Sequence, residues 1–194
     1  MNLIHLKIVF GTLDLLGSYM VMGLFASRLW LLSEDSVVLI PLIQRFGRFY
    51  LWSLTTLILG SISHFIVNAL ILGGKAGLWQ TFSLMGQILM ESHFGHAWLI
   101  HFIALAVLIL GYGFCRKRLP EKDVSGFFLL INALLLLSIT AIGRSGNFGN
   151  FTVIELIDWT HLVATAILGG SFITLTYLLP AGLVGLEVGK RDEL

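Results

Sequence analysis

The chain has little charge and almost no cysteine. Only 12% of its 194 residues are charged, whereas soluble domains carry about 25%. The single cysteine, Cys115, excludes an internal disulfide and any zinc site built from several cysteines. The sequence also lacks HExxH, CxxC and a glycine-rich phosphate loop, so hydrolytic and nucleotide-binding classes have no support. A formal net charge of +1 gives no sign of nucleic acid as a partner.

In place of charge, the chain has long apolar runs. Hydrophobic residues make up 57% of the sequence, and they recur in runs of about 20 residues, long enough to cross a bilayer hydrocarbon core of roughly 30 Å. This pattern predicts an all-α fold, a polytopic bundle of helices in a lipid bilayer, with residues 1–194 forming one integral membrane domain. Five transmembrane helices are expected, at residues 6–32, 48–73, 95–115, 125–143 and 153–179.

Polar segments mark the breaks between these helices. The stretches SEDSVVLIPLIQRFGR, CRKRLPEKD and GRSGNFGNF carry charge, proline, glycine or asparagine, which interrupt apolar helices. The segment after the second helix differs, because its apolar residues share one helical face. These residues are Leu78, Trp79, Phe82, Met85, Ile88 and Leu89. That periodicity predicts a short interfacial helix near residues 77–91 on the outer surface of the membrane.

The basic residues are divided unequally between the two sides of the predicted bundle. Three lie on the side of the N-terminus and nine on the other side. The positive-inside rule therefore predicts a periplasmic N-terminus and a cytoplasmic C-terminus in a bacterial inner membrane. The first residues contain no basic region followed by a cleavage site, so we expect the first helix to be retained.

All six histidines fall in the predicted outer half of the membrane. His64, His101 and His161 lie at a similar depth, about 9–13 Å below the outer boundary at 1.5 Å per residue. Ionisable groups at such depth are costly and mark functional sites by default, although a single buried histidine can also serve only to join two helices. The other three histidines lie at outer helix ends: His5, His93 and His96.

Several polar side chains accompany the deep histidines. Asp158 precedes His161 by three residues on the same helical face. There its carboxylate can hydrogen-bond one imidazole nitrogen and leave the other for a metal. Asn68 shares the face of His64, and Asp14 lies in the outer half of the first helix. These three side chains are the expected supporting residues of a metal site.

Met90, His93 and His96 form a more peripheral group at the start of the third membrane helix. They are expected either to form a vestibule for a metal or to be solvated residues of a helix start. Neutral imidazole binds copper, zinc and iron, and a thioether adds a preference for Cu(I). Two histidines on facing helices can instead ligate a haem b iron, if small residues such as Gly60 and Gly170 open a slot beside them. Spacing alone does not choose between these ligands.

Three stretches of the chain resemble the CopD family of copper-resistance membrane proteins. The first, LWQTFSLMGQILMESHFGHAWLIHFIALAVLIL, is similar to the family's interfacial segment, turn and following helix. The second, LLLLSITAIGRSGN, falls where the family has a Gly-His-Ala helix end, and this chain has no histidine at residues 143–147. The third, DWTHLVATAILGGSFITL, places His161 on the family's histidine. The order and spacing of the three stretches agree with the family over residues 48–179.

The resemblance implies copper handling on the periplasmic side of the inner membrane. Copper bound by His161 with His64 or His101, and a soluble periplasmic copper carrier as partner, are the corresponding expectations. Two other hypotheses stay open. The chain is a haem b subunit for electron transfer in a larger respiratory or oxidising complex, or an accessory membrane subunit without a ligand. Enzyme activity of the chain on its own is not expected under the copper or the accessory hypothesis.

Overall fold

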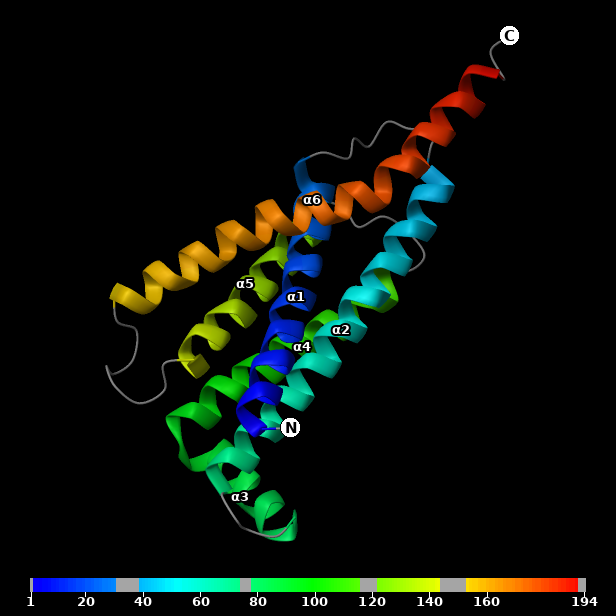
Figure 1. Cartoon of the computed structure of the whole chain (residues 1–194). Helices are drawn as coiled ribbons and strands as arrows, with labels where there is room; N and C mark the ends of the chain where they lie inside the picture. The colour runs from blue at the N-terminus through cyan, green and yellow to red at the C-terminus, as the bar shows by residue number, and fades with distance from the viewer. Residues whose placement is uncertain (1, 31–38, 74–77, 116–121, 144–152, 192–194) are drawn as a thin grey trace.

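The computed structural model describes residues 2–30, 39–73, 78–115, 122–143 and 153–191. These residues form six α-helices and no strand (Figure 1). The helices are α1 (Leu3–Trp30), α2 (Leu39–Gly73), α3 (Leu78–Glu91), α4 (His93–Cys115), α5 (Lys122–Gly143) and α6 (Val153–Arg191). All but α3 are long and apolar enough to cross a membrane. The predicted all-α class and its five long helices are confirmed, and α3 confirms the short helix predicted near residues 77–91.

Two helices extend beyond their predicted apolar spans. α2 begins at Leu39 rather than at residue 48, and α6 continues to Arg191 rather than ending at residue 179. The prediction followed hydrophobicity, which falls where charged residues enter, but charged residues do not end a helix. Pro41 is tolerated because it lies in the first turn of α2, where a backbone N–H has no helical partner. Of the three polar breaks predicted between helices, residues 39–48 of the first belong to α2, and residues 33–38, 116–121 and 144–151 lie outside the described residues.

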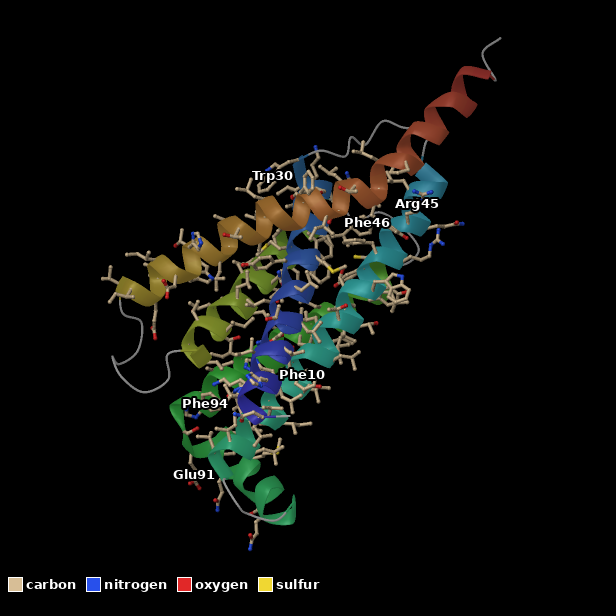
Figure 2. All side chains as sticks on the ribbon, in the orientation of Figure 1. Phe10, Trp30, Arg45, Phe46, Glu91 and Phe94 are labelled. Carbon is tan, nitrogen blue, oxygen red and sulfur yellow. The ribbon has the colours of Figure 1, made fainter. Side chains whose placement is uncertain are left out.

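The long helices run in alternating directions. The start of α1, the end of α2 and the start of α4 therefore lie at the same end of the bundle as α3, which we call the α3 end (Figure 1). The opposite end carries Trp30 and Arg45 and is called the Trp30 end (Figure 2). α1 lies at the centre and packs against α2, α5 and α6, whereas α4 packs against α5 and α2. α3 contacts α4 and α2.

Glycines let the central helix approach its neighbours closely. A Cβ on Gly17 of α1 would meet the Leu57 backbone nitrogen of α2 at 2.5 Å. Gly23 of α1 and Gly170 of α6 face each other, and a Cβ on either would overlap the other's backbone. Close backbone contact through small residues is the usual means of helix association in membranes, where lipid tails remove the hydrophobic driving force between helices.

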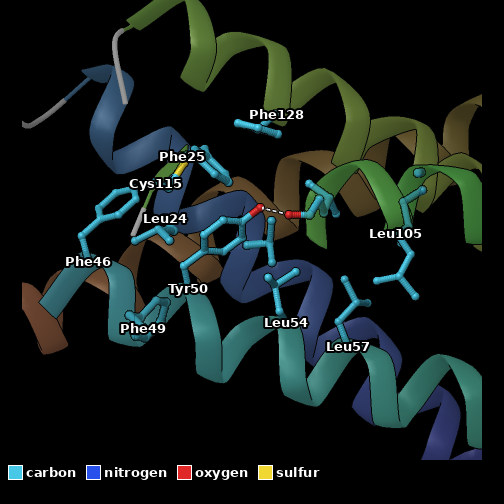
Figure 3. Packing of buried hydrophobic residues seen from close by; sticks show 14 of the residues in the cluster. Leu24, Phe25, Phe46, Phe49, Tyr50, Leu54, Leu57, Leu105, Cys115 and Phe128 are labelled. Atoms are coloured by element: carbon cyan, nitrogen blue, oxygen red, sulfur yellow. Dashed lines mark hydrogen bonds between the residues drawn. The ribbon is translucent and has the colours of Figure 1, made fainter. Parts of the chain in front are cut away.

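Aromatic and aliphatic side chains fill the half of the bundle nearer the Trp30 end. Phe25 of α1 packs edge-on against Tyr50 of α2, with ring centroids 5.1 Å apart, and stacks on Phe128 of α5 at 5.0 Å (Figure 3). The Tyr50 hydroxyl donates a 2.6 Å hydrogen bond to the Leu108 carbonyl of α4. Cys115, the single cysteine of the chain, is buried in the same cluster. This core joins four helices around α1.

The outside of the bundle is apolar. Large exposed apolar side chains lie on every membrane helix, among them Ile8, Leu59, Ile103, Leu130 and Phe172. Soluble proteins rarely expose large apolar patches. The core of a lipid bilayer contains no water, so it accommodates apolar side chains and leaves polar groups without hydrogen-bond partners. The helices are therefore built to face lipid, and polar side chains inside the bundle need partners there.

Candidate functional site

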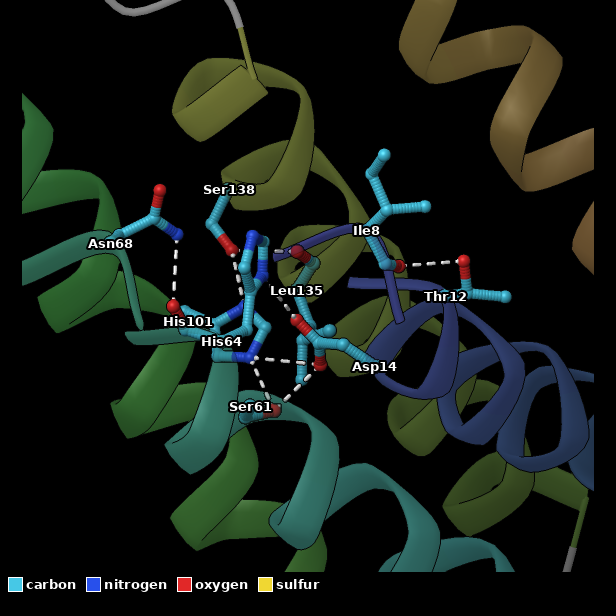
Figure 4. A network of polar contacts seen from close by, with 9 residues as sticks. All are labelled: Ile8, Thr12, Asp14, Ser61, His64, Asn68, His101, Leu135 and Ser138. Atoms are coloured by element: carbon cyan, nitrogen blue, oxygen red, sulfur yellow. Dashed lines mark hydrogen bonds and ion pairs between the residues drawn. The ribbon is translucent and has the colours of Figure 1, made fainter. Parts of the chain in front are cut away.

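A polar cluster lies inside the bundle (Figure 4). The positions of its residues along α1, α2 and α4 place it in the half nearer the α3 end. Its centre is Asp14 of α1, whose side chain is 1% exposed. The Ser61 hydroxyl of α2 donates a 2.6 Å hydrogen bond to Asp14 Oδ1. His101 Nε2 of α4 lies 3.5 Å from the same oxygen, and His64 Nδ1 of α2 lies 3.6 Å from Asp14 Oδ2. Two helices, α2 and α4, thus contribute polar groups around the carboxylate of α1.

Both ring nitrogens of His101 contact serines. Nε2 lies 2.9 Å from Ser61 Oγ, and Nδ1 lies 3.0 Å from Ser138 Oγ of α5. Each hydroxyl already donates its single proton elsewhere, Ser61 to Asp14 and Ser138 to the Leu135 carbonyl at 2.6 Å. The His101 ring therefore bridges Ser61 of α2 and Ser138 of α5 through its two nitrogens, and its Nε2 also faces the Asp14 carboxylate.

His64 meets the same carboxylate in a different way. Its side chain is 12% exposed, and its Nδ1 faces Asp14 Oδ2 across 3.6 Å. Both atoms are buried, and neither has a hydrogen-bond partner among the described residues. An unpaired buried polar atom typically costs about 1–3 kcal/mol. The two facing atoms therefore mark a position where one bound ligand would satisfy both.

Small residues on two helices make these contacts possible. A Cβ on Gly60 of α2 would overlap the Asp14 backbone, with the Asp14 Cα only 2.7 Å away. Gly11 of α1 lies against the His64 ring, where a Cβ would stand 3.5 Å from Cε1 and Nε2. Ser61 and His64 are three residues apart on α2 and so share one helical face. The close approach of α1 and α2 places both side chains beside Asp14.

Aromatic side chains close the cluster towards the α3 end. The fully buried Trp98 of α4 has its ring centroid 5.2 Å from that of His101 and 5.4 Å from that of His64. The rings of Phe65, Phe94 and Phe102 pack against Trp98, and Met85 and Leu89 pack against the same cluster. Since these side chains leave little room for water, charges in the cluster interact more strongly than they would at a solvated surface.

The structure does not bring His161 to this cluster. The sequence predicted a buried histidine at the depth of the other two, and that prediction of burial is wrong, because the His161 side chain is exposed. α6 packs through a different face, and residue 161 projects about 200° from Trp159 on a helix. The residues on the packed face are Trp159, Val163, Ala166 and Ile167. A metal-binding role for His161 stays a prediction.

The predicted supporting residues have unequal places. Asn68 donates a 2.9 Å hydrogen bond to the backbone carbonyl of His64, not to its ring. Asp158 is half-buried on α6, the helix that carries the exposed His161. Asp14, predicted only as a supporting residue, instead lies at the centre of the polar cluster.

The peripheral group lies at the α3 end. Met90 is 73% exposed at the end of α3, and His96 is exposed in the first turn of α4. The side chain of His93 lies outside the described part of the structure. The predicted vestibule therefore stays a prediction, with two of its three side chains placed at the surface.

Two members of the site's surroundings were not predicted from the sequence. Ser138 is one of two hydroxyl residues in the apolar stretch LLLLSITAIG, and Trp98 lies three residues before His101. A polar residue inside an apolar run signals a buried partner. The sequence does not reveal which partner, because that depends on how α5 is rotated against α4.

The geometry bears on the ligands that the sequence left open. Within the described ranges, no three histidine, cysteine or acidic side chains are placed to hold one metal ion together. Both nitrogens of His101 already contact serines. The glycines expected to open a haem slot instead lie against α1, with Gly60 at Asp14 and Gly170 at Tyr19. The atoms best placed to bind a ligand are the facing pair Asp14 Oδ2 and His64 Nδ1.

Five apolar helices around a buried carboxylate and two imidazoles define a polytopic helical membrane protein with a polar centre in one half of its bundle. A family profile described as copper resistance protein D-like, N-terminal domain, matches residues 8–146. The chain belongs to this family. Comparison with curated proteins and with solved structures finds no match.

The matched range includes some of the predicted ligands and not others. Asp14, His64 and His101 lie within residues 8–146, as do the helices α2 to α5 in full and most of α1. α6, with His161, lies beyond the match. The resemblance that the sequence showed to the copper-resistance family is confirmed for the first five helices.

Proposed function

We propose that this protein handles copper within the membrane and that Asp14 and His64 hold the ion during its passage. The observation that carries this proposal is the facing pair of buried atoms without hydrogen bonds, Asp14 Oδ2 and His64 Nδ1. Imidazole nitrogen and carboxylate oxygen are both copper ligands. Membership of a copper-resistance family supports the choice of metal.

A site with only two protein ligands suits passage better than storage. An ion that moves through a membrane protein must bind well enough to enter and weakly enough to leave. Ser61 and His101 hold the Asp14 carboxylate in place through its other oxygen.

The route follows from the predicted orientation. The excess of basic residues on the far side of the bundle supports a periplasmic α3 end in a bacterial inner membrane. Copper then enters from the periplasm past the exposed Met90 and His96 and reaches the facing pair at His64, the partly exposed member of the cluster beside the buried Trp98. A soluble periplasmic copper carrier is the partner expected at the α3 end.

A flux measurement with matched histidine variants tests the proposal. Purified protein is placed in liposomes that contain a trapped copper-sensitive dye, and copper is added outside. We expect His64→Gln to lower the protein-dependent copper flux by at least about ten-fold, the scale of losses at metal-site residues. His161→Gln serves as the control, because it removes an exposed histidine outside the cluster. Its flux is expected to match that of the unmodified protein.

Three results would contradict the proposal. The first is a wild-type flux no greater than that of protein-free liposomes. The second is an unchanged flux in His64→Gln, and the third is an equal loss in His161→Gln. A Soret band with sharp reduced α and β bands in the purified protein would instead favour the haem b hypothesis over copper as the primary ligand.

A further inference from the structure

A second polar feature lies at the Trp30 end, far from the Asp14 cluster. A hollow of about 420 Å³ is lined by Gln44, Gly47 and Arg48 of α2 and by Tyr112 of α4. Ligand sites of small molecules commonly have volumes of about 300–1,000 Å³. Arg48 precedes Ser61 by 13 residues on α2, a rise of about 20 Å. The hollow is therefore separate from the proposed copper site.

The side chains of the hollow are suited to an anion. Gln44 and Arg48 are one helical turn apart, so a carboxamide and a guanidinium line the same side. In the described parts of the chain, no carboxylate forms an ion pair with Arg48. The neighbouring Arg45 donates a 3.4 Å hydrogen bond to the Tyr177 carbonyl of α6. A guanidinium without an acidic partner presents a planar fork of donors that fits a phosphate group.

Tryptophans locate the hollow at the level of lipid headgroups. Trp30, the last residue of α1, is 62% exposed, and Trp52, one turn beyond Arg48, is 65% exposed. Exposed tryptophan is enriched where a membrane meets water. Figure 2 shows Trp30 and Arg45 at the same end of the bundle. Leu51, 46% exposed, follows Arg48 on the side towards the bilayer centre.

From these observations we infer that the hollow binds the phosphate of an anionic phospholipid. Arg48 pairs with the phosphate, and Gln44 contributes its amide donors. The exposed Leu51 and Trp52 contact the acyl chains of the same lipid. Free phosphate has no apolar part that could contact these side chains, so a phospholipid fits the position better. Basic hollows between membrane helices are suited to anionic headgroups in the same way.

Native mass spectrometry of the full chain in detergent tests this inference. The probe is phosphatidylglycerol, with phosphatidylcholine and inorganic phosphate in parallel titrations. We expect Arg48→Gln to lower phosphatidylglycerol binding about five-fold, the effect of one basic residue near an anionic surface. Lys122→Gln removes the same charge from the start of α5 outside the hollow, and its binding is expected to stay within about two-fold of wild type. Arg48→Lys keeps the charge and is expected to retain more lipid than Arg48→Gln.

The other outcomes overturn the inference. Unchanged lipid binding by Arg48→Gln excludes Arg48 as the residue that holds the phosphate. An equal loss in Lys122→Gln shows that lipid binding depends on the overall charge of the Trp30 end and not on Arg48. Equal retention of phosphatidylcholine shows that no anionic headgroup is selected. Displacement of the lipid by an equimolar amount of inorganic phosphate identifies free phosphate as the ligand instead.

Discussion

Gly60 of α2 lies against the backbone of Asp14 of α1, and Ser61, the next residue, donates a hydrogen bond to the Asp14 carboxylate. The missing side chain at Gly60 therefore has a direct consequence for the polar cluster. The two helix backbones come close enough for α2 to present Ser61 and His64 to the same carboxylate. The close packing of α1 against α2 therefore also sets the arrangement of the polar groups around Asp14.

Gly60→Ala is expected to destabilise the protein. The added Cβ would overlap backbone atoms of Asp14, which cannot move aside as a flexible side chain can. Overpacking of this kind typically costs about 1–3 kcal/mol. The midpoint of thermal aggregation of the purified protein measures the effect. Gly169→Ala is the matched control, since a Cβ there meets no atom within 4 Å, and equal midpoints for the two variants would contradict the packing argument.

Asp14→Asn is expected to abolish most copper flux while the protein still folds. The amide oxygen can still accept the Ser61 hydrogen bond, but the charge that attracts copper is lost. We expect a loss of at least about ten-fold in the liposome flux. Asp158→Asn changes a half-buried carboxylate of α6 in the same way and is expected to leave the flux unchanged. Equal fluxes in the two variants would speak against Asp14 as a copper ligand.

Ser61→Ala is expected to cost more stability than Ser138→Ala. Ser61 contacts both Asp14 and His101, on two other helices, whereas Ser138 contacts His101 and a carbonyl of its own helix. Hydrogen bonds between membrane helices contribute about 0.6 kcal/mol on average and at most about 1.7, so the difference is expected to be about one such bond. Thermal unfolding of the two variants in the same detergent measures it. A larger loss in Ser138→Ala would show that the Ser61 contacts contribute little.

The predicted orientation can be tested with reporters fused to the C-terminus. A fluorescent protein that matures only in the cytoplasm is expected to be active there, and alkaline phosphatase, which requires the periplasm, is expected to be inactive. The physical reason is the nine-to-three division of basic residues between the two sides. The opposite pair of activities would place the Asp14 cluster in the cytoplasmic half of the membrane and reverse the proposed copper entry.

The sequence allowed the fold class, the number of long helices and the family to be predicted, because each depends on local properties. The length and hydropathy of an apolar run set whether a helix can cross a bilayer, and alternating helix direction then places residues 14, 64 and 101 in the same half of the bundle. The boundaries of α2 and α6 were less predictable, since a helix continues past the point where hydrophobicity ends.

The tertiary structure decided which of these residues meet. His64, His101 and His161 have similar predicted depth, yet of these three the first two reach Asp14, and Ser138 joins them from α5. Depth follows from position along a helix, whereas contact follows from rotation about its axis. That rotation is set by packing between distant residues, such as the backbone contact between Gly60 and Asp14. No periodicity within one helix contains this information, and so the sequence determined the level of the site while packing determined its members.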